Sequence, residues 1–217
     1  MQIDLLTPDD RERVLAHVEL TNAARRHDTP WVHLTTPHRD EMGLRHGWDG
    51  EPGVSFLGTE DGVTVAAGAY DTSVHDNQHI AWFDVEVHPD HRGRGLGDAM
   101  LAHLMARATD EGKTSVGISC WDTPAGFAGF GQRYGFERKA VGVNRRQHLS
   151  EVDPTVVRRL HDEARAAAGD YDLVRTLGSS DDAELEALAV LTAAINDAPK
   201  EGLEVEDQVF SAERIRT

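Results

Sequence analysis

A short segment rich in glycine and arginine contains the residue types best suited to binding an anion. It carries Gly93, Gly95 and Gly97 in alternate positions, together with Arg92 and Arg94. Glycine leaves backbone N–H groups uncovered, and a helix that begins here adds the partial positive charge of its N-terminus. The two arginines bring full positive charges to the same place. The segment therefore predicts a site for an anion such as a phosphate group.

The residues on either side of this segment predict a strand before it and a helix after it. Phe83, Val85 and Val87 alternate with polar residues, as in a half-buried strand. Pro89 then ends the strand, because proline cannot donate a ladder hydrogen bond. From near Gly95 onward, apolar residues recur every four positions, which indicates an amphipathic helix. These apolar residues are Leu96, Met100, Leu104 and Ala108.

The spacing of the glycines excludes two common phosphate-binding loops. The dinucleotide-binding motif has the pattern Gly-x-Gly-x-x-Gly, and the Walker loop requires Gly-Lys-Ser/Thr. The segment instead resembles the pyrophosphate loop of the GNAT acetyltransferases, which reads Gln/Arg-x-x-Gly-x-Gly/Ala after a Val-x-Val strand. Arg92, Gly95 and Gly97 match the loop, and Val85 and Val87 match the strand. An ordinary strand-to-helix turn is the alternative interpretation.

The resemblance covers about residues 2–149 and implies the GNAT fold, which is of the α/β (α+β) class. We expect a mixed, mostly antiparallel, twisted sheet with helices on both faces. The expected strands cover residues 3–6, 56–59, 63–70, 79–87, 115–120, 139–143 and 145–149. A helix is expected over residues 124–134, and Gly135 and Phe136 match the usual Gly-Phe ending that follows it in the family. Residues 27–50 show little periodicity.

The resemblance implies that acetyl-CoA is the co-substrate and that its acetyl group passes directly to a primary amine of a small molecule or peptide. In the family, the strand pairs its backbone with the pantetheine arm, and the loop holds the pyrophosphate with backbone N–H groups. A backbone N–H near Val87 would donate to the developing oxyanion. The residues implied in cofactor binding are Val85, Glu86, Val87, Arg92, Gly93, Arg94, Gly95, Leu96, Gly97 and Asp98.

Three polar residues share one face of the expected strand and include the candidates for a general base. They are Asp84, Glu86 and His88. The acceptor amine must lose a proton before it can attack, because an alkyl ammonium has a pKa of about 10. We expect Glu86 first and Asp84 second as the base. The alternative is that both carboxylates pair with arginine or lie on a solvated sheet face.

The candidates for a general acid depart from the family pattern. The tyrosine normally found four residues before the Gly-Phe pair is replaced by Gly131, and the asparagine of the same segment by Pro124. Tyr134 is the nearby candidate, with packing in the core as its alternative role. Cys120 ends an expected strand near the thioester, where a buried, inert thiol is the alternative interpretation. A further alternative is that water or the amine supplies the proton.

The acceptor is expected to bind where aromatic and acidic residues accompany each other. The candidate substrate residues are His27, Trp31 and Trp121. Aromatic rings beside carboxylates suit a small cationic amine, through cation–π contacts and ion pairing. The alternative is that the two tryptophans merely close the core. None of the 12 histidines shows a metal-ligand spacing, so no metal is expected.

Composition limits the classes of partner. The formal net charge of -16 argues against nucleic acid and against anionic membrane surfaces, because both demand basic patches. The single cysteine excludes an internal disulfide and suits a reducing compartment. Neither a signal peptide nor an apolar run of membrane-spanning length is visible. A cytoplasmic protein is therefore expected.

The chain is expected to contain more than one part. Residues 1–150 would form the acetyltransferase domain and residues 151–169 a helical linker. Residues 170–217 repeat features of the N-terminus: residues 172–174, 179–182 and 191–194 resemble residues 3–5, 7–10 and 20–23. This arrangement resembles the tandem GNAT proteins of the mycothiol synthase type, and residues 170–217 would open a partial second domain.

Two further expectations follow from these resemblances. The assembly expected is a homodimer or a pairing with a missing second GNAT domain. The alternative function is a non-catalytic, regulatory module that binds acyl-CoA. Gly131 and Pro124 motivate this alternative, because they stand where the family has a tyrosine and an asparagine.

Overall fold

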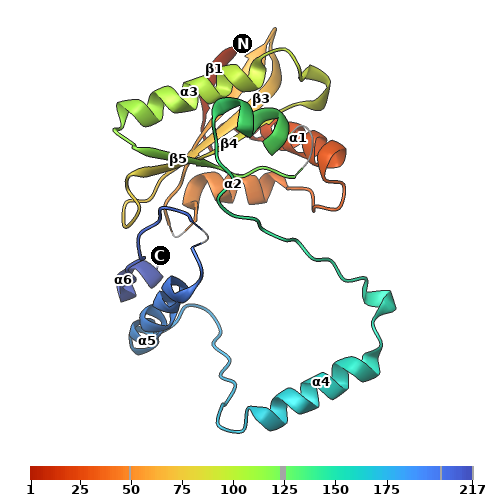
Figure 1. Ribbon diagram of the computed structural model, residues 1–217, viewed down its shortest axis with the longest axis vertical. Helices are drawn as coiled ribbons and strands as arrows, with labels where there is room; N and C mark the ends of the chain where they lie inside the picture. The colour runs from red at the N-terminus through yellow and green to blue at the C-terminus, as the bar shows by residue number, and fades with distance from the viewer. Residues whose placement is uncertain (49, 123–125, 201, 217) are drawn as a thin grey trace.

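A computed structural model of the protein describes residues 1–48, 50–122, 126–200 and 202–216. Its centre is a five-stranded sheet in the order β1-β2-β3-β4-β5 (Figure 1). The strands are β1 (Gln2–Leu6), β2 (Val54–Glu60), β3 (Val63–Asp71), β4 (Ile80–Val87) and β5 (Ser115–Ile118). Neighbouring strands are antiparallel except β4 and β5, which are parallel. The predicted mixed, mostly antiparallel sheet is confirmed.

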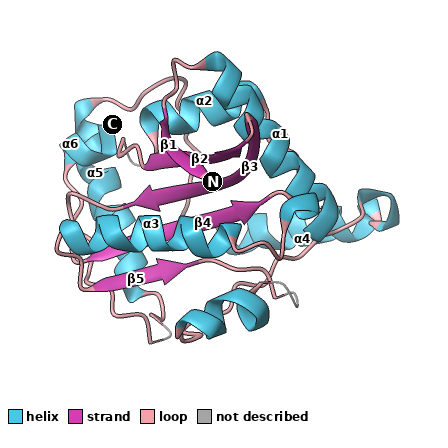
Figure 2. Ribbon diagram, turned by 90° about the horizontal axis from the view of Figure 1, so that it is seen from above, coloured by secondary structure: helices cyan, strands magenta, loops and turns pink. Residues whose placement is uncertain are grey.

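Helices cover both faces of the sheet, as predicted (Figure 2). Helix α3 (Leu96–Asp110) packs Met100, Leu101 and Leu104 against the apolar side chains of β3 and β4. Helix α1 (Arg11–Asp28) packs on the opposite face, where Val14 and Leu20 contact residues of β1, β2 and β3. The alternation of each strand therefore separates two apolar layers.

The segment without clear periodicity before β2 contains a helix that the sequence did not reveal. Helix α2 covers Pro37–His46 and begins at Thr36, whose side chain accepts a hydrogen bond from the N–H of Arg39. None of its residues is buried, so it lacks the apolar stripe from which the sequence could have predicted a helix. It packs beside α1 through Leu44.

Two expectations for the region after β5 need correction. The predicted strands over residues 139–143 and 145–149 are wrong, since the structure has no strand there. Val141 and Val143 are 60% and 69% exposed. The few apolar residues of this segment offer little surface to offset the cost of ordering the chain. Instead of one regular helix over residues 124–134, a π-helix (Phe127–Gly131) and a 3₁₀ helix (Gln132–Tyr134) are present. Glycines at 126, 129 and 131 weaken an α-helix here.

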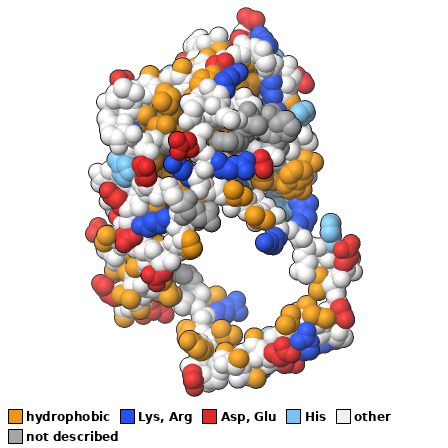
Figure 3. All heavy atoms as spheres, in the orientation of Figure 1, with side chains coloured by type: hydrophobic (Ala, Val, Ile, Leu, Met, Phe, Trp, Pro, Cys, Tyr) orange, Lys and Arg blue, Asp and Glu red, His pale blue; other side chains and the backbone are white. Residues whose placement is uncertain are grey.

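The residues after 150 form helices that reach away from the sheet and return to it. Helix α4 (Pro154–Ala167) begins at Asp153, lies within the expected linker and stands clear of the main body around an opening (Figure 3). Helix α5 (Asp182–Thr192) and the short α6 (Ala212–Arg216) follow. Residues 172–174, which resemble the first strand, lie in no strand and are exposed. Short 3₁₀ helices cover Pro89–His91, Leu149–Glu151 and Ala193–Asp197.

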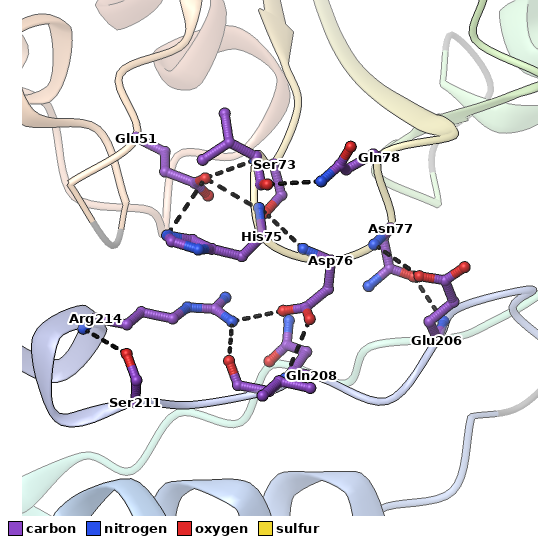
Figure 4. Close-up of polar contacts among 12 residues, drawn as sticks. Glu51, Ser73, His75, Asp76, Asn77, Gln78, Glu206, Gln208, Ser211 and Arg214 are labelled. Atoms are coloured by element: carbon purple, nitrogen blue, oxygen red, sulfur yellow. Dashed lines mark hydrogen bonds and ion pairs between the residues drawn. The ribbon is translucent and has the colours of Figure 1, made fainter.

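The C-terminal residues are attached to the turn between β3 and β4 by a buried ion pair. Arg214 donates to the carboxylate of Asp76, and the N–H of Val209 donates to the same carboxylate over 3.1 Å (Figure 4). Asn77 and Glu206 exchange two further hydrogen bonds. In the part of the chain that the structure describes, no helix is long and apolar enough to cross a membrane.

Candidate cofactor and acceptor site

Strand β5 pairs with only the first half of β4. Their pairing ends at Phe83 and Ile118, so β5 does not cover the second half of β4. The N–H of His88 donates to Val65 of β3 over 3.0 Å. Because backbone groups alternate in direction along an antiparallel strand, those of Val85 and Val87 point to the opposite side, where no described strand pairs with them. This edge is open to pairing with an extended ligand.

The loop after β4 presents a series of backbone N–H groups without acceptors. No described residue accepts a hydrogen bond from the N–H groups of residues 93–98, and the first bond of α3 runs from Ala99 to Gly95. Gly93 and Gly95 have φ of 75° and 80°, which aims consecutive N–H groups at one region. Gly95 precedes α3 without any side-chain cap. The arrangement is a backbone site for an anion at a helix N-terminus.

Gly97 is needed for a close approach rather than for an unusual backbone angle. A Cβ atom at this position would lie 3.1 Å from the ring of Phe130 and 3.6 Å from the side chain of Val87. Leu96, the first residue of α3, is buried in the hydrophobic core. The first turn of α3 is thereby held directly beside the open end of β4.

Both arginines of the loop form ion pairs with carboxylates. Arg92 makes two hydrogen bonds to Asp28 at the end of α1, of 2.8 and 2.6 Å, and donates from Nε to the carbonyl oxygen of Val87 over 3.0 Å. The hydrogen bonds from Arg92 lower the pKa of Asp28. Arg94 pairs with Glu60 over 2.6 Å. Arg92 therefore fixes the conformation of the loop. The positive potential that remains available to an anion comes from the backbone N–H groups.

Glu86 projects from the other face of β4, toward α1. Its Oε2 accepts a hydrogen bond of 2.7 Å from the hydroxyl of Thr21. Burial raises the pKa of Glu86, and the hydrogen bond from Thr21 and the positive charges of His17 and Arg25 oppose this effect. A half-buried carboxylate of raised pKa is a stronger base than a carboxylate in water.

Asp84 lies on the same face in a different setting. It is exposed, but the protein around its carboxyl group still raises its pKa by removing water. Burial and the charge of Asp84 both raise the pKa of Asp71, and the same two causes act on the thiol of Cys120. The expectation of a buried Cys120 is wrong, because β5 ends at Ile118 and Cys120 as a whole residue is exposed, although the protein around its sulfur still removes water.

Tyr134 lies at the N-terminal end of α3. Asp98 forms an ion pair with Arg133, whose guanidinium also donates to the Tyr134 hydroxyl over 3.3 Å. A hydrogen bond to Asp98 raises the pKa of Tyr134. The hydroxyl therefore faces the cofactor loop, and Tyr134 is exposed rather than packed in the core. Pro124, the other residue that departs from the family pattern, lies outside the described residues.

The structure brings together two of the three candidate acceptor residues. The rings of Trp31 and Trp121 meet edge to face with their centroids 6.3 Å apart. They are 47% and 42% exposed, so they do not simply close the core. His27 instead contacts Asp28 over 2.8 Å, beside Arg92. Among the described residues, no group of three histidine, cysteine, aspartate or glutamate side chains could hold a metal ion.

Sequence reasoning missed the residues that α1 contributes. Thr21 contacts Glu86 and Asp28 holds Arg92, but no pattern in the sequence places α1 against β4. The spacing of His17, Thr21 and Arg25 by four residues could have shown that they share one face of a helix. Their partner on the sheet becomes visible only in three dimensions.

Comparisons with known sequences give consistent matches. A model described as "Acetyltransferase (GNAT) family" matches residues 18–136. Mycothiol acetyltransferase of Stackebrandtia nassauensis is 31% identical over 165 residues, which are 74% of this chain and 49% of that protein. Mycothiol acetyltransferase of a Parafrankia species is 38% identical over 74 residues, 33% of this chain and 21% of that protein. The chain thus spans at most about half the length of these curated relatives.

Solved structures share the fold at low sequence identity. A tandem GNAT protein from the clavulanic acid biosynthesis pathway has a TM-score of 0.52 and 22% identity, covering 62% of this chain and 43% of that chain. A putative acetyltransferase from Agrobacterium tumefaciens strain C58 has a TM-score of 0.51 and 22% identity, covering 68% of this chain and 100% of that chain. Likeness at this level concerns the fold alone.

Proposed function

This chain belongs to the acetyltransferase (GNAT) family, whose members are acyltransferases that use acetyl-CoA, and on that basis we propose that it acetylates a primary amine of a small molecule or peptide. The observation that supports the proposal most directly is the series of N–H groups at the start of α3 for which no described residue is an acceptor, next to the edge of β4 that β5 leaves unpaired. A diphosphate and an extended arm containing amides fit these two features.

We assign the binding of acetyl-CoA mainly to backbone groups. Residues 93–98 would hold the diphosphate through N–H groups, and Val85 and Val87 would pair with the pantetheine arm. Arg92 would act by holding the loop to Asp28. Acetyl-CoA, when bound, supplies an acetyl thioester. The N–H of Val87 would then donate to the carbonyl oxygen as negative charge develops on it.

Glu86 is the proposed general base. The acceptor ammonium must lose its proton, and the raised pKa of Glu86 makes this carboxylate a stronger base than one in water. Asp84 is the second candidate, because it lies on the same face of β4. Tyr134 is the proposed general acid. Its hydroxyl lies near Asp98 at the cofactor loop, so it would donate a proton only to a group bound there.

We propose a cationic amine as the acceptor. Trp31 and Trp121 offer exposed ring faces, and Asp84 and Glu86 provide negative charge on the same side of the sheet as α1. His27, which contacts Asp28, is the third residue proposed to bind the acceptor. The curated relatives are named mycothiol acetyltransferases, and only acetyl transfer is carried over to this chain.

The experiment that tests the proposal combines binding with turnover. Calorimetry with acetyl-CoA is expected to show binding, and a panel of primary amines with free-thiol detection is expected to reveal amine-stimulated release of CoA. Binding without any amine-stimulated thiol release would favour a non-catalytic acyl-CoA module. Gly131 in place of the usual tyrosine supports that second candidate. Absence of binding would contradict both.

We also propose that the chain is modular. Residues 1–150 would carry the activity, residues 151–169 would link, and residues 170–217 would derive from duplication of the N-terminal segment. Pairing with a second copy or with a second GNAT domain is the proposed assembly. Light scattering on purified protein tests the first of these two by measuring its mass in solution.

A further inference from the structure

A hydroxyl group on α1 donates a hydrogen bond to Glu86, the proposed base. The Thr21 hydroxyl donates to Oε2 of Glu86 over 2.7 Å, and Thr21 is only 7% exposed. Within the described parts of the chain, this is the only side-chain hydrogen bond that Glu86 makes. Because Oε2 is engaged, the other carboxylate oxygen is left for a proton of the acceptor.

Charged neighbours of Thr21 on α1 act at longer range. His17 and Arg25 lie one turn before and one turn after Thr21, so all three share a helix face. The ring of His17 contacts Asp40 over 2.8 Å, and the guanidinium of Arg25 donates to the carbonyl oxygen of His33 over 2.9 Å. Both side chains have their own partners, so among the described residues Thr21 is the one whose side chain hydrogen-bonds to Glu86.

We propose that Thr21 is a positioning residue that fixes the orientation of the Glu86 carboxylate and favours its ionised form. This inference rests on the proposed role of Glu86 as general base. A hydroxyl can donate to an ionised carboxylate but must compete with the carboxyl proton when the acid is neutral. Loss of the hydroxyl therefore favours the neutral, inactive acid.

The other groups around Glu86 set the background against which this hydrogen bond acts. Burial and the negative charge of Asp84 on β4 favour the neutral acid, whereas His17 and Arg25 on α1 favour the carboxylate. Arg92 from the cofactor loop also interacts with the charge of Glu86. Replacement of Thr21 leaves all of these groups in place, so any change in titration is due to the hydroxyl.

The test replaces the hydroxyl by a methyl group of similar size. In Thr21→Val, the acid limb of the kcat/KM profile is expected to move to higher pH, with a loss of about threefold to tenfold on that limb. Thr21→Ser is expected to restore the wild-type profile. Thr35→Val, which removes another buried hydroxyl not bonded to Glu86, is the matched control. If Thr21→Val does not fold, Thr21→Ala replaces it.

A second measurement separates this inference from the proposed function. The carboxyl carbon of Glu86, identified by loss of its NMR resonance in Glu86→Gln, is titrated without any substrate. A titration midpoint that moves to higher pH in Thr21→Val supports the inference even if no amine is acetylated. Identical midpoints in folded wild type and Thr21→Val would overturn it. If Glu86→Gln keeps full activity while the midpoint moves, only the proposed role of Glu86 fails.

Discussion

Glu86 and Asp84 differ in what surrounds them, although both carboxyl groups project from the same face of β4. Glu86 is half-buried and bonded to Thr21, whereas Asp84 is exposed and makes no such bond within the described residues. We expect Glu86→Gln to lower kcat/KM about a hundredfold and to abolish the acid limb of the pH profile. Asp84→Asn serves as the comparison and is expected to lose less than tenfold. Unchanged kcat/KM in Glu86→Gln at every pH would exclude Glu86 as the base.

The raised pKa of Glu86 also has a consequence for stability. The folded protein binds this proton more readily than the unfolded chain does, so stability is lost as pH rises above the unfolded pKa of about 4.3. Glu86→Gln is therefore expected to melt at a higher temperature than wild type near pH 7 and at a similar temperature near pH 4. Thermal melts across this range test it, with the exposed Glu19→Gln as control. A stability advantage confined to low pH would contradict the reasoning.

Gly95 combines a positive φ with a place in the anion site. An alanine at φ of 80° costs about 1 kcal/mol, and relief of this strain would move the N–H groups proposed to hold the diphosphate. Gly95→Ala is expected to lower Tm slightly and to weaken acetyl-CoA binding at least tenfold, as measured by calorimetry. Gly142→Ala, at an exposed position with open space around it, is the control. Equal affinity in Gly95→Ala and wild type would argue against a backbone site here.

At the scale of elements, one side chain couples the cofactor loop to α1. Asp28 accepts two hydrogen bonds from Arg92, and this pair holds the loop against the last turn of the helix. Asp28→Asn is expected to reduce the free energy of unfolding at pH 7 by about 1 kcal/mol and to weaken acetyl-CoA binding. The pKa of Asp28 is lowered, so its contribution is lost as pH falls through the folded pKa.

The measurement that checks the Asp28 prediction is the difference in stability between wild type and variant as a function of pH. The difference is expected to be largest above pH 5 and to shrink toward pH 3. Asp9→Asn, which changes an exposed aspartate paired with Arg45, is the matched control. A difference that stayed constant with pH would show that the charge of Asp28 is not responsible.

The elements that were predictable are those with strong local signals. Alternation around Phe83, Val85 and Val87 predicted β4, and the four-residue spacing from Leu96 predicted α3. Helix α2 was missed because it buries no residue. The strands expected over residues 139–143 and 145–149 are absent, and the sparse apolar residues there find no partner on β5. Local periodicity is thus informative where a face is buried and uninformative elsewhere.

The candidate site was predictable only where it depends on backbone and glycine. The positions of Gly93 and Gly95 could be expected from their spacing, because positive φ and a helix N-terminus are local properties. The contacts of Thr21 and Asp28 could not, because they join residues 65 and 64 positions apart. Arg92 shows the same limit: its type suggested contact with an anion, and the structure bonds it to Asp28.

At the scale of the whole molecule, the C-terminal residues are held to the sheet by a buried ion pair. The side chains of Asp76 and Arg214 are only 8% and 4% exposed. Arg214 also donates to the carbonyl oxygen of Val209 over 2.8 Å and stacks on Phe210. Removing one partner of a buried ion pair typically costs about 3–5 kcal/mol. Among the described residues, the other polar contacts between this segment and the turn include two hydrogen bonds between Asn77 and Glu206 and one between His79 and Glu204. These lie at exposed positions, where each is worth much less than the buried pair.

Asp76→Ala is therefore expected to release residues 204–216 from the sheet without unfolding it. Limited proteolysis should cleave the C-terminal segment of the variant at least tenfold faster than that of wild type, while the remaining fragment keeps its thermal transition. Arg216→Ala, which removes an exposed ion pair with Asp182, is the control and is expected to behave as wild type. Equal cleavage rates in Asp76→Ala and wild type would show that other contacts hold the segment. Loss of the main transition would show that the C-terminal residues are part of the core fold.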